Sequence, residues 1–106
     1  DSPASYREGV DLVAKRVSKE LEEAGGDARW DEEGKALIAE FPGDSRAPVL
    51  LLGHMDTVFP VGEAARRPFT VEGNRVTGPG ALDMKGGVAV MLSALKALHS
   101  AGDSCF

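Results

Sequence analysis

A short apolar run, Val49-Leu50-Leu51-Leu52, limits what this chain can fold into more than any other segment. It stands between Pro48 and Gly53, and no polar residue interrupts its apolar side chains. A strand with one face in water alternates apolar and polar residues, whereas an unbroken run is typical of a strand covered on both faces. The run therefore predicts a sheet strand with further layers of structure on its two sides.

Two amphipathic helices are predicted, one before this run and one after it. In the first, apolar residues recur at steps of three and four: Tyr6, Val10, Val13, Val17 and Leu21. Ser2 is expected to cap this helix, Pro3 to occupy its first turn, and Gly25-Gly26 to end it. The same spacing returns between about residues 85 and 100, at Val88, Met91, Leu92, Leu95 and Leu98.

The remaining regular segments have the character of strands. Residues 36–41 predict a strand, and residues 69–71 and 75–77 predict a hairpin around Glu72-Gly73-Asn74. Trp30, between the first helix and the first strand, is expected to pack rather than to bind a ligand. The order helix, strand, strand, hairpin, helix predicts an α/β domain.

Length and charge exclude some classes of function. The chain has 106 residues, the size of one small domain, with 12 Lys and Arg against 17 Asp and Glu, a net charge of −5. An acidic chain is poorly suited to holding nucleic acid by its phosphates, and no run approaches the roughly 18 apolar residues of a membrane helix. The chain opens Asp1-Ser2-Pro3 without an initiator Met or signal peptide. We expect that its native start is missing or processed, and the cytoplasm is favoured.

The first candidate site follows the apolar run directly, at Gly53-His54-Met55-Asp56. In an extended chain His54 and Asp56 lie on the same side, with Cα atoms about 6.6 Å apart. A neutral imidazole is a good zinc ligand, and a carboxylate can hold its other ring nitrogen. The tripeptide alone favours a simpler interpretation, a histidine at the edge of the core.

The second candidate site is Asp83, in a glycine-flanked turn that leads into the last predicted helix. Asp83 is also well placed to be a simple helix cap. Gly86-Gly87 at the helix start allows a phosphate cradle in principle, but the P-loop pattern is absent. These glycines indicate close backbone packing or a tight approach to a site. The single cysteine, Cys105, excludes an intrachain disulfide and a cysteine-based structural zinc site.

Taken together, the two segments resemble a known family far more specifically than either does alone. The motifs that carry the resemblance are Leu52-Gly53-His54-Met55-Asp56-Thr57-Val58, Arg67-Pro68-Phe69 and Gly78-Pro79-Gly80-Ala81-Leu82-Asp83-Met84-Lys85-Gly86-Gly87. This pattern is similar to the zinc-dependent metallopeptidases of the glutamate carboxypeptidase, aminoacylase and acetylornithine deacetylase family. Thr57-Val58-Phe59-Pro60 and Gly78-Pro79-Gly80 are most similar to the glutamate carboxypeptidase branch.

The resemblance implies roles for three residues. His54 matches the first zinc ligand, Asp56 the catalytic acidic residue that orients this histidine, and Asp83 the carboxylate that bridges two zinc ions and precedes a cis peptide bond. The implied reaction is hydrolysis of an amide bond next to a free carboxylate, in a peptide or a small N-acyl amino acid. The implied parent is an α/β/α catalytic domain with a second, dimerising domain. If the resemblance holds, the side chains of His54 and Asp83 must converge.

The family pattern also contains parts that this sequence lacks. The family next supplies a Glu-Glu pair with the general base, a further acidic ligand and a distal histidine, but only Asp103 follows Asp83 among acidic residues. Glu22-Glu23 and Glu32-Glu33 precede the motif, and His99 is expected on the surface of the last helical turn. We therefore expect residues 1–106 to be the N-terminal portion of a metallopeptidase catalytic domain. The alternative is a truncated, non-catalytic chain that acts at most as a weak metal-binding or structural module.

Overall fold

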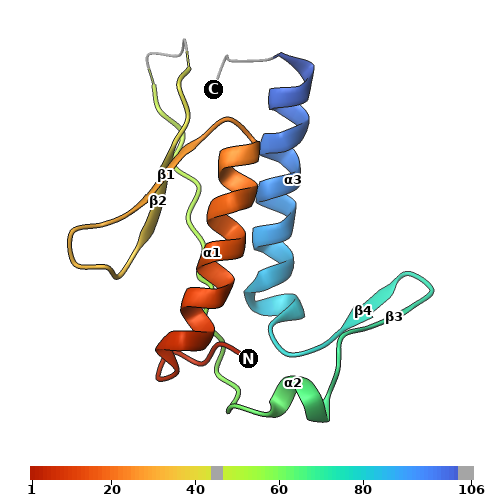
Figure 1. Ribbon diagram of the computed structural model, residues 1–106. Helices are drawn as coiled ribbons and strands as arrows, with labels where there is room; N and C mark the ends of the chain where they lie inside the picture. The colour runs from red at the N-terminus through yellow and green to blue at the C-terminus, as the bar shows by residue number, and fades with distance from the viewer. Residues whose placement is uncertain (44–46, 103–106) are drawn as a thin grey trace. The chain divides into compact units, whose positions relative to one another are not determined.

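The computed structural model describes residues 1–43 and 47–102, and Asp103 and Cys105 lie outside the described residues (Figure 1). The chain divides into two compact units, each built from two stretches of sequence. The first unit contains Asp1–Val13 and Gly53–Ala89, and the second contains Ala14–Leu52 and the chain from Val90 onward. Both candidate site segments belong to the first unit.

The first helix, α1, spans Arg7–Glu23, so the predicted helix is confirmed but its predicted start is wrong. Pro3 forms a parallel bridge with Thr57 instead of a first helical turn. Ser2 does not cap the helix, because its hydroxyl donates to the carbonyl oxygen of Met55 at 2.9 Å. A long-range hydrogen bond has replaced the local one that sequence signals favour. The predicted end is confirmed, since Gly25 follows with a φ of 87°.

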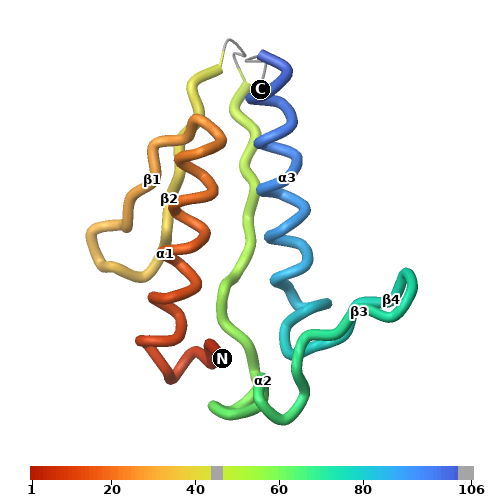
Figure 2. Tube along the Cα trace, turned by 45° about the vertical axis from the view of Figure 1, so that its right-hand side comes forward, coloured from red at the N-terminus to blue at the C-terminus, as the bar shows by residue number. Residues whose placement is uncertain are grey.

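In the second unit the C-terminal part of α1 lies beside α3, which spans Gly86–Ala101 and confirms the second predicted helix (Figures 1 and 2). Lys96 of α3 pairs with Glu23 of α1 at 2.7 Å and also with Glu20. Three buried hydrophobic residues of the described chain belong to this unit: Ala14, Ala24 and Leu95. These side chains form a small core.

A two-stranded antiparallel sheet completes the second unit. β1 (Asp27–Trp30) pairs with β2 (Leu37–Glu40), with Asp27 opposite Glu40 and Trp30 opposite Leu37. The predicted strand at 36–41 is confirmed, whereas β1 was not expected because its Asp-Ala-Arg-Trp sequence carries little strand signal. The Asp31 carboxylate secures the connecting turn by accepting hydrogen bonds from the amides of Lys35 and Ala36.

The apolar run at 49–52 is not a covered strand in this structure, which corrects the prediction of a sheet strand there. Within residues 1–43 and 47–102 it pairs with neither two-stranded sheet. Its residues are 52–84% exposed to solvent. Leu50 is the most exposed of the four and Leu51 is the least exposed. A strand is stabilised by a hydrogen-bonded neighbour, and this segment has none among the described strands.

The first unit contains a hairpin and a short helix. β3 (Thr70–Glu72) pairs with β4 (Arg75–Thr77) in antiparallel register, which confirms the predicted hairpin. The four-residue helix α2 (Glu63–Arg66) was not predicted, because it depends on a distant residue. The Asp1 carboxylate accepts hydrogen bonds from the amides of Gly62 and Ala64, each at 2.8 Å.

The last element of the first unit is η1 (Ala81–Lys85), a tight turn that leads directly into α3. The combination of helices with two small antiparallel sheets confirms the predicted mixed α/β class. No helix within the described part of the chain is long and apolar enough to cross a membrane.

Candidate metal and catalytic site

The side chains of His54 and Asp83 meet in the first unit. His54 follows the extended apolar run, and Asp83 lies in η1. The Nε2 atom of His54 is 2.8 Å from Oδ1 of Asp83, although 29 positions separate the two residues in the sequence. The expected convergence of these side chains is therefore found, while their role as metal ligands stays a prediction.

Asp56 contacts the opposite ring nitrogen of the same histidine. Its Oδ1 is 3.0 Å from Nδ1 of His54, and its backbone oxygen is 3.2 Å from the same nitrogen. The predicted same-side placement of His54 and Asp56 is thus present in the structure. One carboxylate on each nitrogen determines the orientation of the imidazole ring.

The backbone of η1 turns the Asp83 carboxylate toward His54. Asp83 and Met84 have non-helical dihedral angles, and the peptide bond between them is cis, as the family resemblance implied. Gly80 precedes the turn with a φ of 77°, in the left-handed region that favours glycine. A Cβ atom on Gly80 would also lie 2.8 Å from Cγ2 of Thr57, so this position requires glycine for two reasons.

The site is open to solvent and negatively charged. The side chains of His54 and Asp83 are 44% and 80% exposed. The hydrogen bond with Asp83, and after it the one with Asp56, raises the pKa of His54 above its ordinary value, although partial burial opposes this effect. Two carboxylates around one imidazole stabilise positive charge at this position. That charge is carried either by the protonated ring or by a metal ion.

The donor atoms present fit part of a zinc site. An imidazole nitrogen and a carboxylate oxygen converge, and a second carboxylate stands behind the imidazole, as in many zinc sites. Among residues 1–43 and 47–102, no group of three or more His, Cys, Asp or Glu side chains is arranged to hold a metal ion. This part of the chain thus offers two candidate ligands, His54 and Asp83, and one residue that orients a ligand.

The other candidate residues lie elsewhere or have a packing role. His99 is exposed in the last turn of α3, in the second unit, which confirms its expected surface position. The glycines at the start of α3 are explained by packing, because a Cβ on Gly86 would collide with the Ala81 carbonyl oxygen and one on Gly87 would lie 3.1 Å from Cε of Met84. A phosphate cradle is not needed to account for them.

A hydrogen-bonded pair beside the site was not predicted from the sequence. The Nζ atom of Lys85 donates to Oγ of Ser2 at 2.7 Å, and Ser2 donates onward to the Met55 carbonyl oxygen. Burial lowers the pKa of Lys85, although the Asp56 carboxylate acts in the opposite direction. The only available signal was the lysine in the Asp83-Met84-Lys85 motif, since nothing local distinguishes Ser2 from a helix cap.

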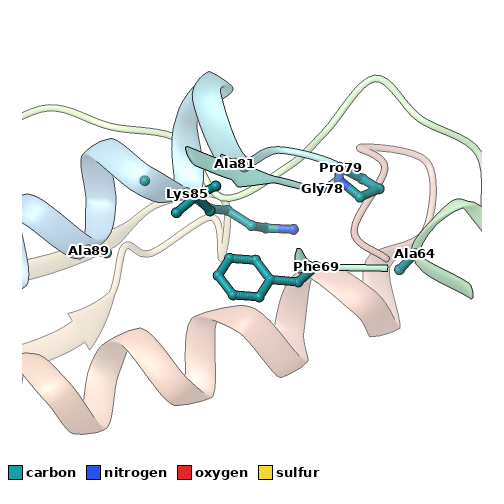
Figure 3. Close-up of a pocket in the computed structure, with 9 residues that line it drawn as sticks. Ala64, Phe69, Gly78, Pro79, Ala81, Lys85 and Ala89 are labelled. Atoms are coloured by element: carbon teal, nitrogen blue, oxygen red, sulfur yellow. The ribbon is translucent and has the colours of Figure 1, made fainter. Parts of the chain in front are cut away.

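An apolar pocket of about 260 Å³ lies between the hairpin and the start of α3 (Figure 3). Phe69, from the Arg67-Pro68-Phe69 motif, and Lys85 both line it. The other lining residues are Ala64, Val76, Gly78, Pro79, Ala81, Gly86 and Ala89. Two of the motifs quoted for the family resemblance, Arg67-Pro68-Phe69 and the segment from Gly78 to Gly87, thus contribute residues to this cavity.

Comparison with known proteins agrees with these motifs. The model of peptidase family M20/M25/M40 matches residues 50–105. Carboxypeptidase G2 of Pseudomonas sp. (strain RS-16) is 44% identical over 69 residues, which are 65% of this chain and 17% of that protein. A protein of Aeropyrum pernix named for hydrolysis of LysW-lysine and LysW-ornithine is 34% identical over 104 residues, which are 98% of this chain and 27% of that protein. The chain therefore spans about a quarter or less of the length of these curated relatives.

Proposed function

Because this chain belongs to peptidase family M20/M25/M40, we propose that it is the N-terminal portion of the catalytic domain of a zinc-dependent hydrolase. The small share of each relative that it spans supports this assignment. On this proposal the rest of the catalytic domain and a dimerising domain belong to a longer protein. That protein cleaves an amide bond next to a free carboxylate, a reaction consistent with the name of the carboxypeptidase relative.

The observation that carries the proposal is the meeting of His54 and Asp83 at 2.8 Å, with Asp56 on the other ring nitrogen. A histidine bound to zinc must be neutral at the nitrogen that coordinates the metal. Asp56 accepts a hydrogen bond from the Nδ1–H group, which places the ring proton on Nδ1 and leaves the lone pair of Nε2 for the metal. Asp83 supplies negative charge next to that nitrogen, and its carboxylate would hold the metal together with His54.

The residues of this chain prepare the site rather than complete the reaction. Zinc, when bound, acts as a Lewis acid and lowers the pKa of a coordinated water. His54 and Asp83 hold the metal, and Asp56 keeps the imidazole in one orientation. The substrate is a peptide or a small N-acyl amino acid with a free carboxylate. The general base and the remaining ligands come from the part of the protein beyond this segment.

Zinc titration of the full chain of 106 residues tests the metal site. Competition with a chromophoric chelator is expected to show binding that weakens at least about tenfold in His54→Ala and in Asp83→Ala. His99→Ala is the matched control, because it removes the other histidine without touching this site. Equal zinc affinity in the wild type and in His54→Ala would contradict the assignment.

An assay of zinc-dependent hydrolysis distinguishes the proposed hydrolase from the alternative, a non-catalytic module. We expect residues 1–106 alone to show no turnover of N-acyl glutamate with added zinc, because a catalytic zinc typically has three protein ligands and an open position. The longer protein that contains this segment is expected to hydrolyse such a substrate and to lose that activity in His54→Ala. A longer protein without zinc-dependent hydrolysis favours the alternative, a weak metal-binding or structural module. Zinc-dependent turnover by residues 1–106, lost in His54→Ala, would overturn the assignment to a partial catalytic domain.

A further inference from the structure

We propose that Ser2 and Lys85 are positioning residues that hold the segment with His54 and Asp56 against the turn with Asp83. The pair acts through a hydrogen-bonded chain from the Lys85 ammonium to the Ser2 hydroxyl and on to the Met55 carbonyl oxygen. The inference rests on the proposed function, since the arrangement that it maintains is the one assigned to metal binding. Neither side chain bonds to His54 or Asp83 in the described hydrogen bonds, so the role proposed for the pair is positioning.

Two hydrogen bonds join Ser2 to the segment that carries His54 and Asp56. It is fully buried, with a relative exposure of 0%. Its hydroxyl donates to the Met55 oxygen at 2.9 Å, and its backbone oxygen accepts a hydrogen bond from the Thr57 amide at 2.9 Å. Met55 lies directly between His54 and Asp56 in the sequence, so these two bonds hold the backbone that carries both site residues.

Lys85 connects this anchor to the turn that contains Asp83. Its backbone amide donates to the Gly80 oxygen at 2.8 Å, which closes η1. Its side chain then reaches Ser2 at 2.7 Å across 83 positions of sequence. Since Asp83 precedes Lys85 by two residues in the same turn, fixing Lys85 also limits where the Asp83 carboxylate lies.

Burial explains why the anchor is needed. The contact between His54 and Asp83 is exposed, so water competes for both partners. The Ser2 hydroxyl is shielded from water, and breaking its bonds leaves buried polar groups unpaired. The partly buried chain of hydrogen bonds, centred on the buried Ser2, therefore keeps the two segments in register while the exposed site stays accessible.

The experiment compares Ser2→Ala, Lys85→Met and the double variant in the full chain, labelled with ¹⁵N-histidine and free of metal. The readout is the imidazole N–H signals of His54, with those of His99 as an internal reference. Lys85→Arg tests rescue, because it keeps a cationic donor. Ser5→Ala and Lys96→Met are matched controls, since Ser5 is exposed and Lys96 lies in the second unit.

We expect detectable His54 N–H signals in the wild type, in Lys85→Arg and in both controls, and their loss in Ser2→Ala and Lys85→Met. Zinc affinity is expected to fall about 10- to 100-fold in either single variant. The double variant is expected to be no weaker than the weaker single variant, because both changes break one chain of bonds. Retained His54 signals, additive losses, or equal loss in Lys85→Arg and Lys85→Met would overturn the proposal.

Two further measurements separate this proposal from a general effect on folding and from the proposed function. Loss of the far-ultraviolet helical signal in both single variants would assign the pair a purely structural role and overturn the positioning role. A wild-type chain without zinc affinity, whose His54 signals still depend on Ser2 and Lys85, contradicts the metal site but supports positioning. Zinc bound at His54 with no effect of Ser2→Ala or Lys85→Met supports the metal site and contradicts positioning.

Discussion

His54 is a histidine whose two ring nitrogens both face carboxylates. Asp83 and Asp56 raise its pKa, in that order of importance. Because the folded-state pKa is raised, the protonated ring stabilises the metal-free chain fully below about pH 6.5, the ordinary value for histidine. This stabilisation is lost as the pH rises through the raised pKa. Zinc requires the neutral ring, so protons and zinc compete for this site.

The first prediction concerns this competition. Asp83→Asn removes the charge next to Nε2, so the pKa of His54 is expected to fall toward its ordinary value. Titration of the His54 ring protons by NMR measures the change in the metal-free chain. Zinc affinity of the wild type is expected to decrease as the pH falls through the raised pKa. An unchanged His54 titration in Asp83→Asn would contradict the contact seen here.

A second prediction concerns Gly80, whose left-handed backbone and close approach to Thr57 both exclude a side chain. Gly80→Ala is expected to destabilise the chain by about 1–2 kcal/mol from the backbone conformation alone, and by more because of the contact with Thr57. Gly73→Ala is the matched control, with a φ of 61° and open space around its Cβ position. Chemical denaturation measures both. Equal losses in the two variants would show that the Thr57 contact has no energetic effect.

Among the secondary-structure elements, α1 and α3 hold the second unit together by a small core and a pair of surface contacts. Leu95 of α3 is 9% exposed, and Ala14 and Ala24 are more deeply buried. Lys96 joins α3 to two glutamates of α1. The apolar contact and the charged contact are expected to respond differently to mutation and to pH.

The third prediction tests the apolar contact. Leu95→Ala is expected to lower the free energy of unfolding by about 2–4 kcal/mol, because it removes buried methyl groups from a core with few members. Val90→Ala, at an exposed position of the same helix, is expected to cost about 0.5 kcal/mol or less. Denaturant melts followed by circular dichroism compare the two. Similar losses would mean that Leu95 is not part of a packed core.

The fourth prediction tests the charged contact. The hydrogen bonds from Lys96 lower the pKa values of Glu20 and Glu23 and raise that of Lys96. With depressed carboxyl pKa values, the stabilisation is present above about pH 4.5 and is lost as the pH falls through the folded-state pKa values. The raised lysine pKa predicts a second loss above about pH 10.5. Melting temperatures of the wild type and Lys96→Met are expected to differ between these limits and to converge outside them.

For the chain as a whole, the dominant feature is the exposed apolar run at 49–52. Its side chains are open to solvent, and its backbone pairs with no strand among the described residues. If the chain is part of a longer protein, as proposed, other segments cover this run there. In the isolated chain, exposed apolar side chains and an unpaired backbone edge promote association.

The fifth prediction follows from this exposure. The isolated chain is expected to be oligomeric or poorly soluble, and replacement of Leu50 and Leu52 by lysine is expected to shift it toward monomer. These two residues are separated by one position and are 84% and 82% exposed, so their replacement leaves the small core intact. Light scattering on freshly purified samples measures the change. A wild-type chain that is a monodisperse monomer with a single cooperative melt would show that the run is protected in another way.

Periodicity and turn chemistry were sufficient to predict both long helices, the hairpin at 70–77 and the strand at 37–40. These features depend on residues within a few positions of one another. The same holds for the pairing of His54 with Asp56, since alternation along an extended segment places them on one side. The role of Asp83 could be predicted only from the motif resemblance, because its glycine-flanked turn is also suited to a helix cap.

Tertiary structure decided the features that join distant positions. Ser2 was predicted to cap α1, but its hydroxyl bonds to Met55 and Lys85 instead, because a buried hydroxyl takes the partners that folding brings to it. Asp1 likewise supports α2 from more than sixty positions away. The structure of the run at 49–52 likewise depends on residues that are distant in the sequence. Its sequence specifies a covered strand, but pairing requires a neighbouring strand, and no local pattern can supply one.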